Sequence, residues 1–215
     1  MVYFFLKWAI GPFYRLWLRK VEGLENVPED QNFILAMNHS SLYDSMLVPI
    51  IILPKVDKKI SALVSSYYWR NMVTKAILNH YESIPLYIKK ELNIKAKNKK
   101  SFDRALAALK KKRIIMVFPE GGRSIEGKIK KAYPGVAKLA LKAKVPVLPC
   151  GIIGSYKVIP KGKILPRLAR CDVKIGKLIH FNEYCDKKIN NKIVDKVTRK
   201  IMKEIAKLIG QTYNY

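Results

Sequence analysis

Acidic side chains, cysteines and long apolar runs are all scarce in this chain of 215 residues. Only 16 Asp and Glu stand against 42 Lys and Arg, so the formal net charge is +26. No run of 18 uncharged apolar residues occurs, which argues against a transmembrane helix. The three cysteines, Cys150, Cys171 and Cys185, lie far apart without a CxxC pair. We therefore expect reduced thiols, with no zinc site and no disulfide framework.

The composition is otherwise that of a folded protein, with 49% hydrophobic and 27% charged residues. The excess of positive charge predicts a polyanionic partner, either nucleic acid or an anionic membrane. Codon bias in an AT-rich genome is a competing explanation, because the chain is rich in Lys, Ile and Asn. A nucleic-acid partner is disfavoured, because the aromatic residues concentrate in residues 1–20 whereas the lysines are dispersed.

The amino-terminal segment, residues 1–22, is predicted to be an amphipathic membrane-docking helix. It is dense in Phe, Trp, Tyr and Leu, and on a helix Lys7, Arg15 and Arg19 fall within about a third of the circumference. Such a helix would lie in the interface without crossing the bilayer. A secretory signal is disfavoured, since Lys7 interrupts the apolar stretch and no small-residue cleavage pattern follows. A helix packed on the core of the domain itself remains an alternative.

Residues 23–215 are predicted to form one α/β domain, in which a mostly parallel mixed sheet is flanked by helices. Short apolar runs alternate with segments of helical period, as in α/β proteins. Helices are expected after a Ser101 cap, after Pro134 and from about Asn190. Residues 154–170 are expected to be a long irregular connection. The expected strands are Phe33–Met37, Ile60–Val64, Ser83–Ile88, Arg113–Phe118, Val147–Ile153 and Cys171–Ile175.

The first polar motif, NHSSLYD at residues 38–44, directly follows an apolar strand. Sites in α/β folds are usually built at the carboxyl ends of strands. With His39 and Asp44 five positions apart, the carboxylate can reach back to one imidazole nitrogen when the chain turns into a helix. The other nitrogen would then be free to take a proton. Asp44 as a simple N-cap of the apolar run at residues 46–53 is the alternative.

The second polar motif, FPEGGRS at residues 118–124, follows another apolar strand. Gly121 and Gly122 permit close backbone approach, and Arg123 offers a fork that matches phosphate oxygens. Glu120 is expected to orient either Arg123 or an acceptor hydroxyl. A tight turn with a surface ion pair is the alternative.

The two motifs together resemble the glycerolipid acyltransferase family, typified by 1-acyl-sn-glycerol-3-phosphate acyltransferase. The family's H-x-x-x-x-D motif is present as His39 to Asp44, and its F-P-E-G-[TS]-R-S block as Phe118 to Ser124. A third block, V-P-[IV]-x-P, appears at residues 145–149. The resemblance covers roughly residues 20–180, and motifs in the right order are more specific than either alone.

The resemblance implies acyl transfer from acyl-CoA or acyl carrier protein to the hydroxyl of 1-acylglycerol-3-phosphate (lysophosphatidate), which gives phosphatidate. His39 would be the general base and Asp44 would orient it. The acceptor phosphate would be bound by the second block, which comprises Glu120, Gly121, Gly122, Arg123 and Ser124. No metal and no cofactor are implied, and no nucleic acid. The expected location is the cytoplasmic face of the cell membrane, with the protein held peripherally or monotopically on anionic lipid.

Three departures from the family pattern concern the acceptor. Gly122 replaces the usual Thr or Ser, Ile88 stands where a phosphate-contacting arginine is usual, and Tyr133 replaces a frequent lysine. Another lysophospholipid or lipid acceptor therefore remains an alternative, as does a non-catalytic lipid-binding protein.

Overall fold

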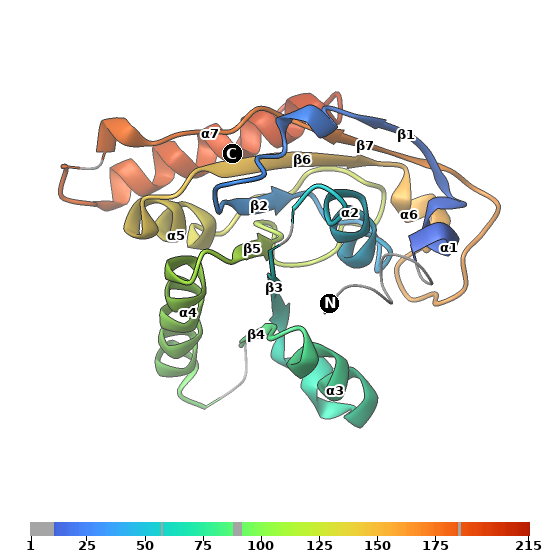
Figure 1. Ribbon diagram of the computed structural model, residues 1–215, viewed down its shortest axis with the longest axis horizontal. Coiled ribbons are helices and arrows are strands. Elements are labelled where there is room, and N and C mark those ends of the chain that lie inside the picture. Colours follow the sequence, from blue (N-terminus) through green and yellow to red (C-terminus); the bar gives the residue numbers. More distant parts are fainter. Residues whose placement is uncertain (1–10, 57, 88–91, 185) are drawn as a thin grey trace.

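The computed structural model describes residues 11–56, 58–87, 92–184 and 186–215, and the strands in these ranges form one seven-stranded sheet (Figure 1). Neighbouring strands are parallel except for the antiparallel pair β6–β7. The sheet is therefore mixed and mostly parallel, as predicted. Its spatial order is β1 (Leu18–Glu22), β7 (Cys171–Ile175), β6 (Val147–Ile153), β2 (Ile34–Met37), β5 (Ile114–Val117), β3 (Ile60–Ser65) and β4 (Ile84–Leu86).

The central strands are apolar on both faces because both faces are covered. Along β2, Ile34 and Ala36 face one core, whereas Leu35 and Met37 face the other. All four side chains are fully buried. Near-continuous apolar runs of this kind are typical of parallel strands between two layers of helices.

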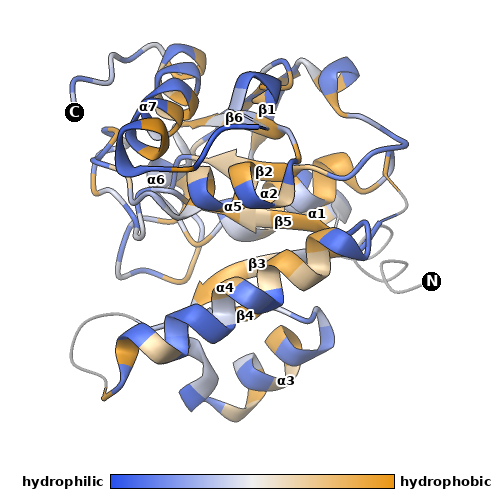
Figure 2. Ribbon diagram, turned by 90° about the vertical axis from the view of Figure 1, so that its left-hand side faces the viewer, coloured by the Kyte–Doolittle hydropathy of each residue, from blue (hydrophilic) through white to orange (hydrophobic). Residues whose placement is uncertain are grey.

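The helices form the two outer layers of an α/β/α arrangement (Figures 1 and 2). One face of the sheet is covered by α4 (Ile94–Lys110), α5 (Gly135–Ala143) and α7 (Asn191–Leu208). The other is covered by α1 (Gly11–Arg15), α2 (Asp44–Ile52) and α6 (Ser155–Val158). The pair η3 (Ser66–Arg70) and α3 (Met72–His80) follows β3, and η2 (Leu24–Asn26) and η4 (Asn182–Tyr184) are single 3-10 turns.

The amino-terminal segment differs from the predicted continuous helix. Residues 1–10 lie outside the described residues, and α1 is short. Leu18–Glu22 is a strand, not a helix, because β7 offers a parallel partner and Asp172 forms an ion pair with Arg19. Among the described residues, none of the helices has the length and apolarity needed to cross a membrane.

Ser101 is not a helix cap. Helix α4 begins earlier, at Ile94, and Ser101 lies in its buried interior. Its hydroxyl donates to Pro85 O and Lys97 O, so a polar residue inside the helix ties it to β4. By contrast, α7 begins directly after Asn190, whose side chain accepts from the Ile193 amide as an N-cap.

Candidate active site

The two polar motifs meet because their strands are adjacent and parallel. Strand β2 leads into His39 and β5 leads into Phe118, and Ala36 is in register with Val117. The carboxyl ends of both strands therefore lie at one edge of the sheet. Asn38 links the end of β2 to β6, the neighbour on its other side. Its side-chain amide donates to Ile152 O (2.9 Å) and accepts from Ile152 N (2.7 Å).

His39 and Asp44 form the hydrogen-bonded pair that their spacing predicts. His39 Nδ1 lies 3.0 Å from Asp44 Oδ2. The same oxygen accepts from the amides of Ser40 (2.7 Å) and Ser41 (2.8 Å). Asp44 is the first residue of α2 and is completely buried. Its carboxylate thus turns back onto the preceding loop, which is not the geometry of an N-cap.

The imidazole of His39 is held at one ring face by Phe118 and at Nδ1 by Asp44. Its ring stacks on Phe118, with centroids 3.8 Å apart and an interplanar angle of 17°. The side chain is 13% exposed, and Nε2 has no hydrogen-bond partner among the described residues. In the tautomer with the proton on Nδ1, which Asp44 accepts, Nε2 carries a free lone pair.

Glu120 joins the two motifs through backbone amides. Its Oε1 accepts from His39 N (3.0 Å) and its Oε2 from Lys130 N (2.9 Å). Ser124 adds a second link, since its amide donates to His39 O (2.8 Å). Burial raises the pKa of Glu120 to about 7, although the two amides favour the charged form. In the part of the chain that the structure describes, both carboxylate oxygens of Glu120 thus accept from backbone amides and neither bonds Arg123. Its orienting role toward Arg123 or an acceptor hydroxyl stays a prediction.

The glycines of the second motif differ in what they require. Gly121 has a φ of +68°, and an added Cβ would lie 2.6 Å from the Tyr133 ring. Only glycine fits there without strain. Gly122 has open space, with Lys130 Nζ at 3.9 Å from an added Cβ as its nearest contact. The same ammonium donates to Gly122 O (2.5 Å) and to Arg123 O (3.4 Å).

Arg123 carries an unsatisfied donor. Its Nη1 is buried and has no hydrogen-bond partner among the described residues. A buried donor without a partner costs free energy unless a bound group accepts from it. An anionic oxygen next to Arg123 would remove that cost.

Sequence reasoning missed several residues that hold the site together. Ser40 Oγ lies 2.8 Å from Ser155 Oγ, and Ser41 Oγ donates to Ile159 O (2.8 Å). These contacts fix the first motif to the start of the 154–170 connection. Nothing in the local sequence predicts them, because the partners are more than 100 positions away. Of the other expected residues, Cys150 and Cys171 are free and buried, whereas Ile88 and Cys185 lie outside the described residues.

No group of three or more His, Cys, Asp or Glu side chains is placed to hold a metal ion in the part of the chain that the structure describes. The described residues place the imidazole of His39 beside the turn that carries Arg123, since Ser124 N donates to His39 O.

Comparison with known proteins identifies the family of the chain. The model of the family described as Acyltransferase matches residues 18–153. The chain therefore belongs to the Acyltransferase family, and the resemblance predicted from the two motifs is confirmed.

Among curated proteins, the chain is similar to the chloroplastic 1-acyl-sn-glycerol-3-phosphate acyltransferase LPAT1 of Arabidopsis thaliana, with 28% identity over 155 residues that cover 72% of this chain and 40% of the relative. It is also similar to the 1-acyl-sn-glycerol-3-phosphate acyltransferase of Bacillus subtilis, with 25% identity over 161 residues (75% and 73%). The match spans less than half the length of the plant relatives.

A solved structure shares the fold over nearly the whole chain. It is the crystal structure of PlsC from Thermotoga maritima, a 1-acyl-sn-glycerophosphate (LPA) acyltransferase. The TM-score is 0.68 at 26% identity, and the alignment covers 96% of this chain and 79% of that one.

Proposed function

We propose that this protein transfers a fatty acyl group from an acyl thioester to the hydroxyl of 1-acylglycerol-3-phosphate, which gives phosphatidate for phospholipid synthesis. The observation that carries the proposal is the buried contact between His39 and Asp44, which leaves Nε2 free beside an anion-accepting turn. The names of the relatives point to the same reaction class.

His39 acts as the general base in this reaction. Nε2 takes the proton of the acceptor hydroxyl as its oxygen attacks the thioester carbonyl, and Asp44 stabilises the positive ring. The carbon–sulfur bond then breaks, and the imidazolium returns the proton to the leaving thiolate. No protein nucleophile is needed, since the acceptor supplies the attacking oxygen.

Arg123 binds the acceptor phosphate. Its buried Nη1 lacks a partner, and the turn around it carries the ammonium of Lys130. Lys130 substitutes for the family lysine that Tyr133 replaces. Its ammonium bonds the carbonyls of the turn, so it holds the turn in place and adds positive charge. Because Gly122 leaves open space, the absent Thr or Ser hydroxyl changes the shape of this turn little.

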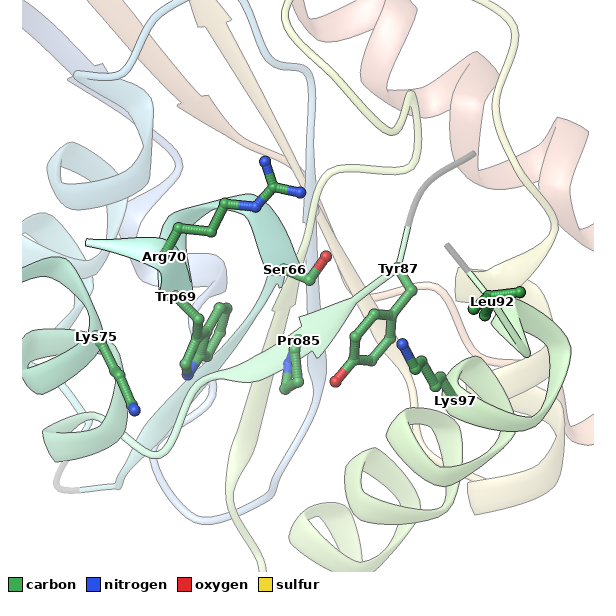
Figure 3. A pocket seen from close by; sticks show the side chains of 8 residues that line it. All are labelled: Ser66, Trp69, Arg70, Lys75, Pro85, Tyr87, Leu92 and Lys97. Atoms are coloured by element: carbon green, nitrogen blue, oxygen red, sulfur yellow. The ribbon is translucent and has the colours of Figure 1, made fainter. Parts of the chain in front are cut away.

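The donor's phosphates enter a separate basic cavity of about 540 Å³ beyond the carboxyl ends of β3 and β4 (Figure 3). Three of its lining side chains are cationic, and none of the described ones is acidic. Two aromatic side chains complete a lining that suits phosphates carried on an organic group. The lining residues are Ser66, Trp69, Arg70, Lys75, Pro85, Tyr87, Leu92 and Lys97.

The test is thiol release by the purified full chain, with acyl-CoA or acyl carrier protein as donor and lysophosphatidate or its dephosphorylated counterpart as acceptor. We expect turnover that requires the phosphate and that is lost in His39→Ala. Arg123→Ala should raise KM for lysophosphatidate at least tenfold, whereas Arg104→Ala, which removes an exposed guanidinium on α4, should not. A tenfold change in KM corresponds to about 1.4 kcal/mol of binding free energy, which is about what one hydrogen bond to a charged group contributes.

Three outcomes would redirect the proposal. Equal turnover without the phosphate would assign another lipid acceptor. Absence of turnover with either donor would favour a non-catalytic lipid-binding protein. If the pair Arg70→Ala and Lys75→Ala left the donor KM unchanged relative to a Lys110→Ala, Lys111→Ala control, the donor site would lie elsewhere.

A further inference from the structure

The connection between α6 and β7 exposes large apolar side chains that none of the described residues covers. Ile164 is 81% exposed, Leu165 is 76% exposed and Leu168 is fully exposed. The connection is bonded to Trp17, since the indole nitrogen of Trp17 donates to Arg167 O. Close to Trp17 in the chain, Phe13 on α1 and Leu16 just after α1 are also exposed. We name these five side chains the docking surface. Contiguous exposed apolar surface rimmed by polar residues marks an interaction site.

The docking surface stands on a firmly held base. Arg167 N donates to Val158 O (2.8 Å), and the indole of Trp17 donates to Arg167 O (2.9 Å). Residues 159–166 thus form a loop whose ends are joined by the bond from Arg167 to Val158, and Trp17, between α1 and β1, also bonds Arg167. The exposure of the apolar tip is therefore a feature of a fixed loop and not of a frayed end.

The charges around the docking surface are all of one sign. Residues 154–170 contain five basic residues and no acidic one. Lys161, Lys163, Arg167 and Arg170 form no ion pair with any other described residue, whereas Arg19 and Lys20 on β1 are paired with Asp172 and Glu22. Unpaired cations next to exposed Leu and Ile are the combination that binds an anionic lipid interface.

We infer that the docking surface inserts into an anionic membrane, with the four unpaired cations at the headgroup level. The loop that carries the surface is bonded directly to the catalytic turn, since Ile159 O accepts from Ser41 Oγ and Ser155 pairs with Ser40. Insertion would therefore set His39 at a defined height above the lipid from which an acceptor is drawn. The docking surface lies outside residues 1–10. Only the placement of His39 above the lipid rests on the proposed function.

The experiment measures binding of the full chain to phosphatidylcholine vesicles, with and without phosphatidylglycerol, by cosedimentation. We expect the triple variant Ile164→Ser, Leu165→Ser, Leu168→Ser to bind anionic vesicles at least tenfold more weakly. A matched control, Met72→Ser, Val73→Ser, Ile77→Ser on α3, removes three other exposed apolar side chains and should leave binding unchanged.

Charge and insertion are tested separately. Lys161→Glu with Lys163→Glu should weaken vesicle binding by more than about 25-fold. Loss of each positive charge alone is expected to weaken it by about fivefold, and the added negative charges weaken it further. The matched control is Lys203→Glu with Lys207→Glu on α7, which covers the other face of the sheet. In Leu168→Trp, the added fluorescence should be quenched by brominated lipid, whereas that of Met72→Trp should not.

Unchanged binding of the triple variant together with unquenched Leu168→Trp would overturn the inference. Loss of self-association in the triple variant, without loss of vesicle binding, would make the surface an interface between copies of this chain. Loss of binding to an acidic carrier protein alone would make it a protein-docking surface. Since none of these measurements depends on turnover, their failure is distinct from failure of the proposed reaction.

Discussion

Replacement of Asp44 by Asn tests the proposed mechanism most directly, because it changes charge with almost no change in shape. The amide oxygen can occupy the position of Oδ2 and still accept from His39 and from the amides of Ser40 and Ser41. The Nδ1 proton then stays in place, and only the negative charge is lost. The amide nitrogen falls at the buried position of Oδ1, which has no partner.

The magnitude follows from the geometry of the pair. Two unit charges about 4 Å apart interact by about 4 kcal/mol at an effective dielectric constant of about 20. That term stabilises the imidazolium that forms in the transition state, so kcat should fall by about a thousandfold. The free energy of unfolding should fall by only about 1–3 kcal/mol, the cost of burying the unpartnered amide nitrogen.

The assay is thiol release under saturating donor and acceptor, with unfolding by urea followed in parallel. Asp195→Asn, which alters an exposed carboxylate on α7, is the matched control. Because Asp44 is proposed to act only through His39, Asp44→Asn should cause no further loss in the His39→Ala background. A kcat within tenfold of the unmodified protein, or additive losses in the double variant, would refute the assigned role.

Three further outcomes concern the frame of the site. Glu120 has a pKa of about 7 in the folded protein, against an ordinary value of 4.5. As the pH rises, its carboxyl therefore ionises in the unfolded chain before it ionises in the folded protein. Stability should therefore fall by up to about 3 kcal/mol between about pH 4.5 and 7, a dependence that urea titrations of Glu120→Gln should lack. Gly121→Ser should destabilise by about 1–3 kcal/mol in thermal unfolding, whereas Gly122→Ser should be neutral. Asn38→Ala should cost about 2–4 kcal/mol in urea unfolding, because it strips two buried backbone groups of Ile152 of their partners; a smaller loss would mean that water replaces them.

Much of the central architecture was predictable from local pattern alone. The strands β6 and β7 have the predicted bounds, and β2, β3 and β5 differ from them by one or two residues at their ends. Helix α7 begins at Asn191, next to the predicted start at about Asn190. Apolar periodicity and capping act over a few residues, so a local reading captures them. The pairing of His39 with Asp44 is equally local, since five positions span one turn at the end of β2.

The contacts that hold the His39–Asp44 pair in place were not predictable in this way. The choice of Glu120 for the amides of His39 and Lys130, the bond from Ser41 to Ile159, and the parallel pairing of β1 with β7 join distant residues. Residues 18–22 have an aromatic, basic lead-in that suits a helix, and only a partner strand some 150 positions later makes them a strand.

The sequence by itself thus indicated that His39 and Asp44 form a pair and which strands present the two polar motifs. The tertiary structure alone decided what holds those residues, which cations are paired and which are left for a partner, and where exposed apolar side chains gather. The physical reason is that propensity and side-chain periodicity are properties of neighbours in the chain. Burial, pairing and accessibility depend instead on the arrangement of the whole fold.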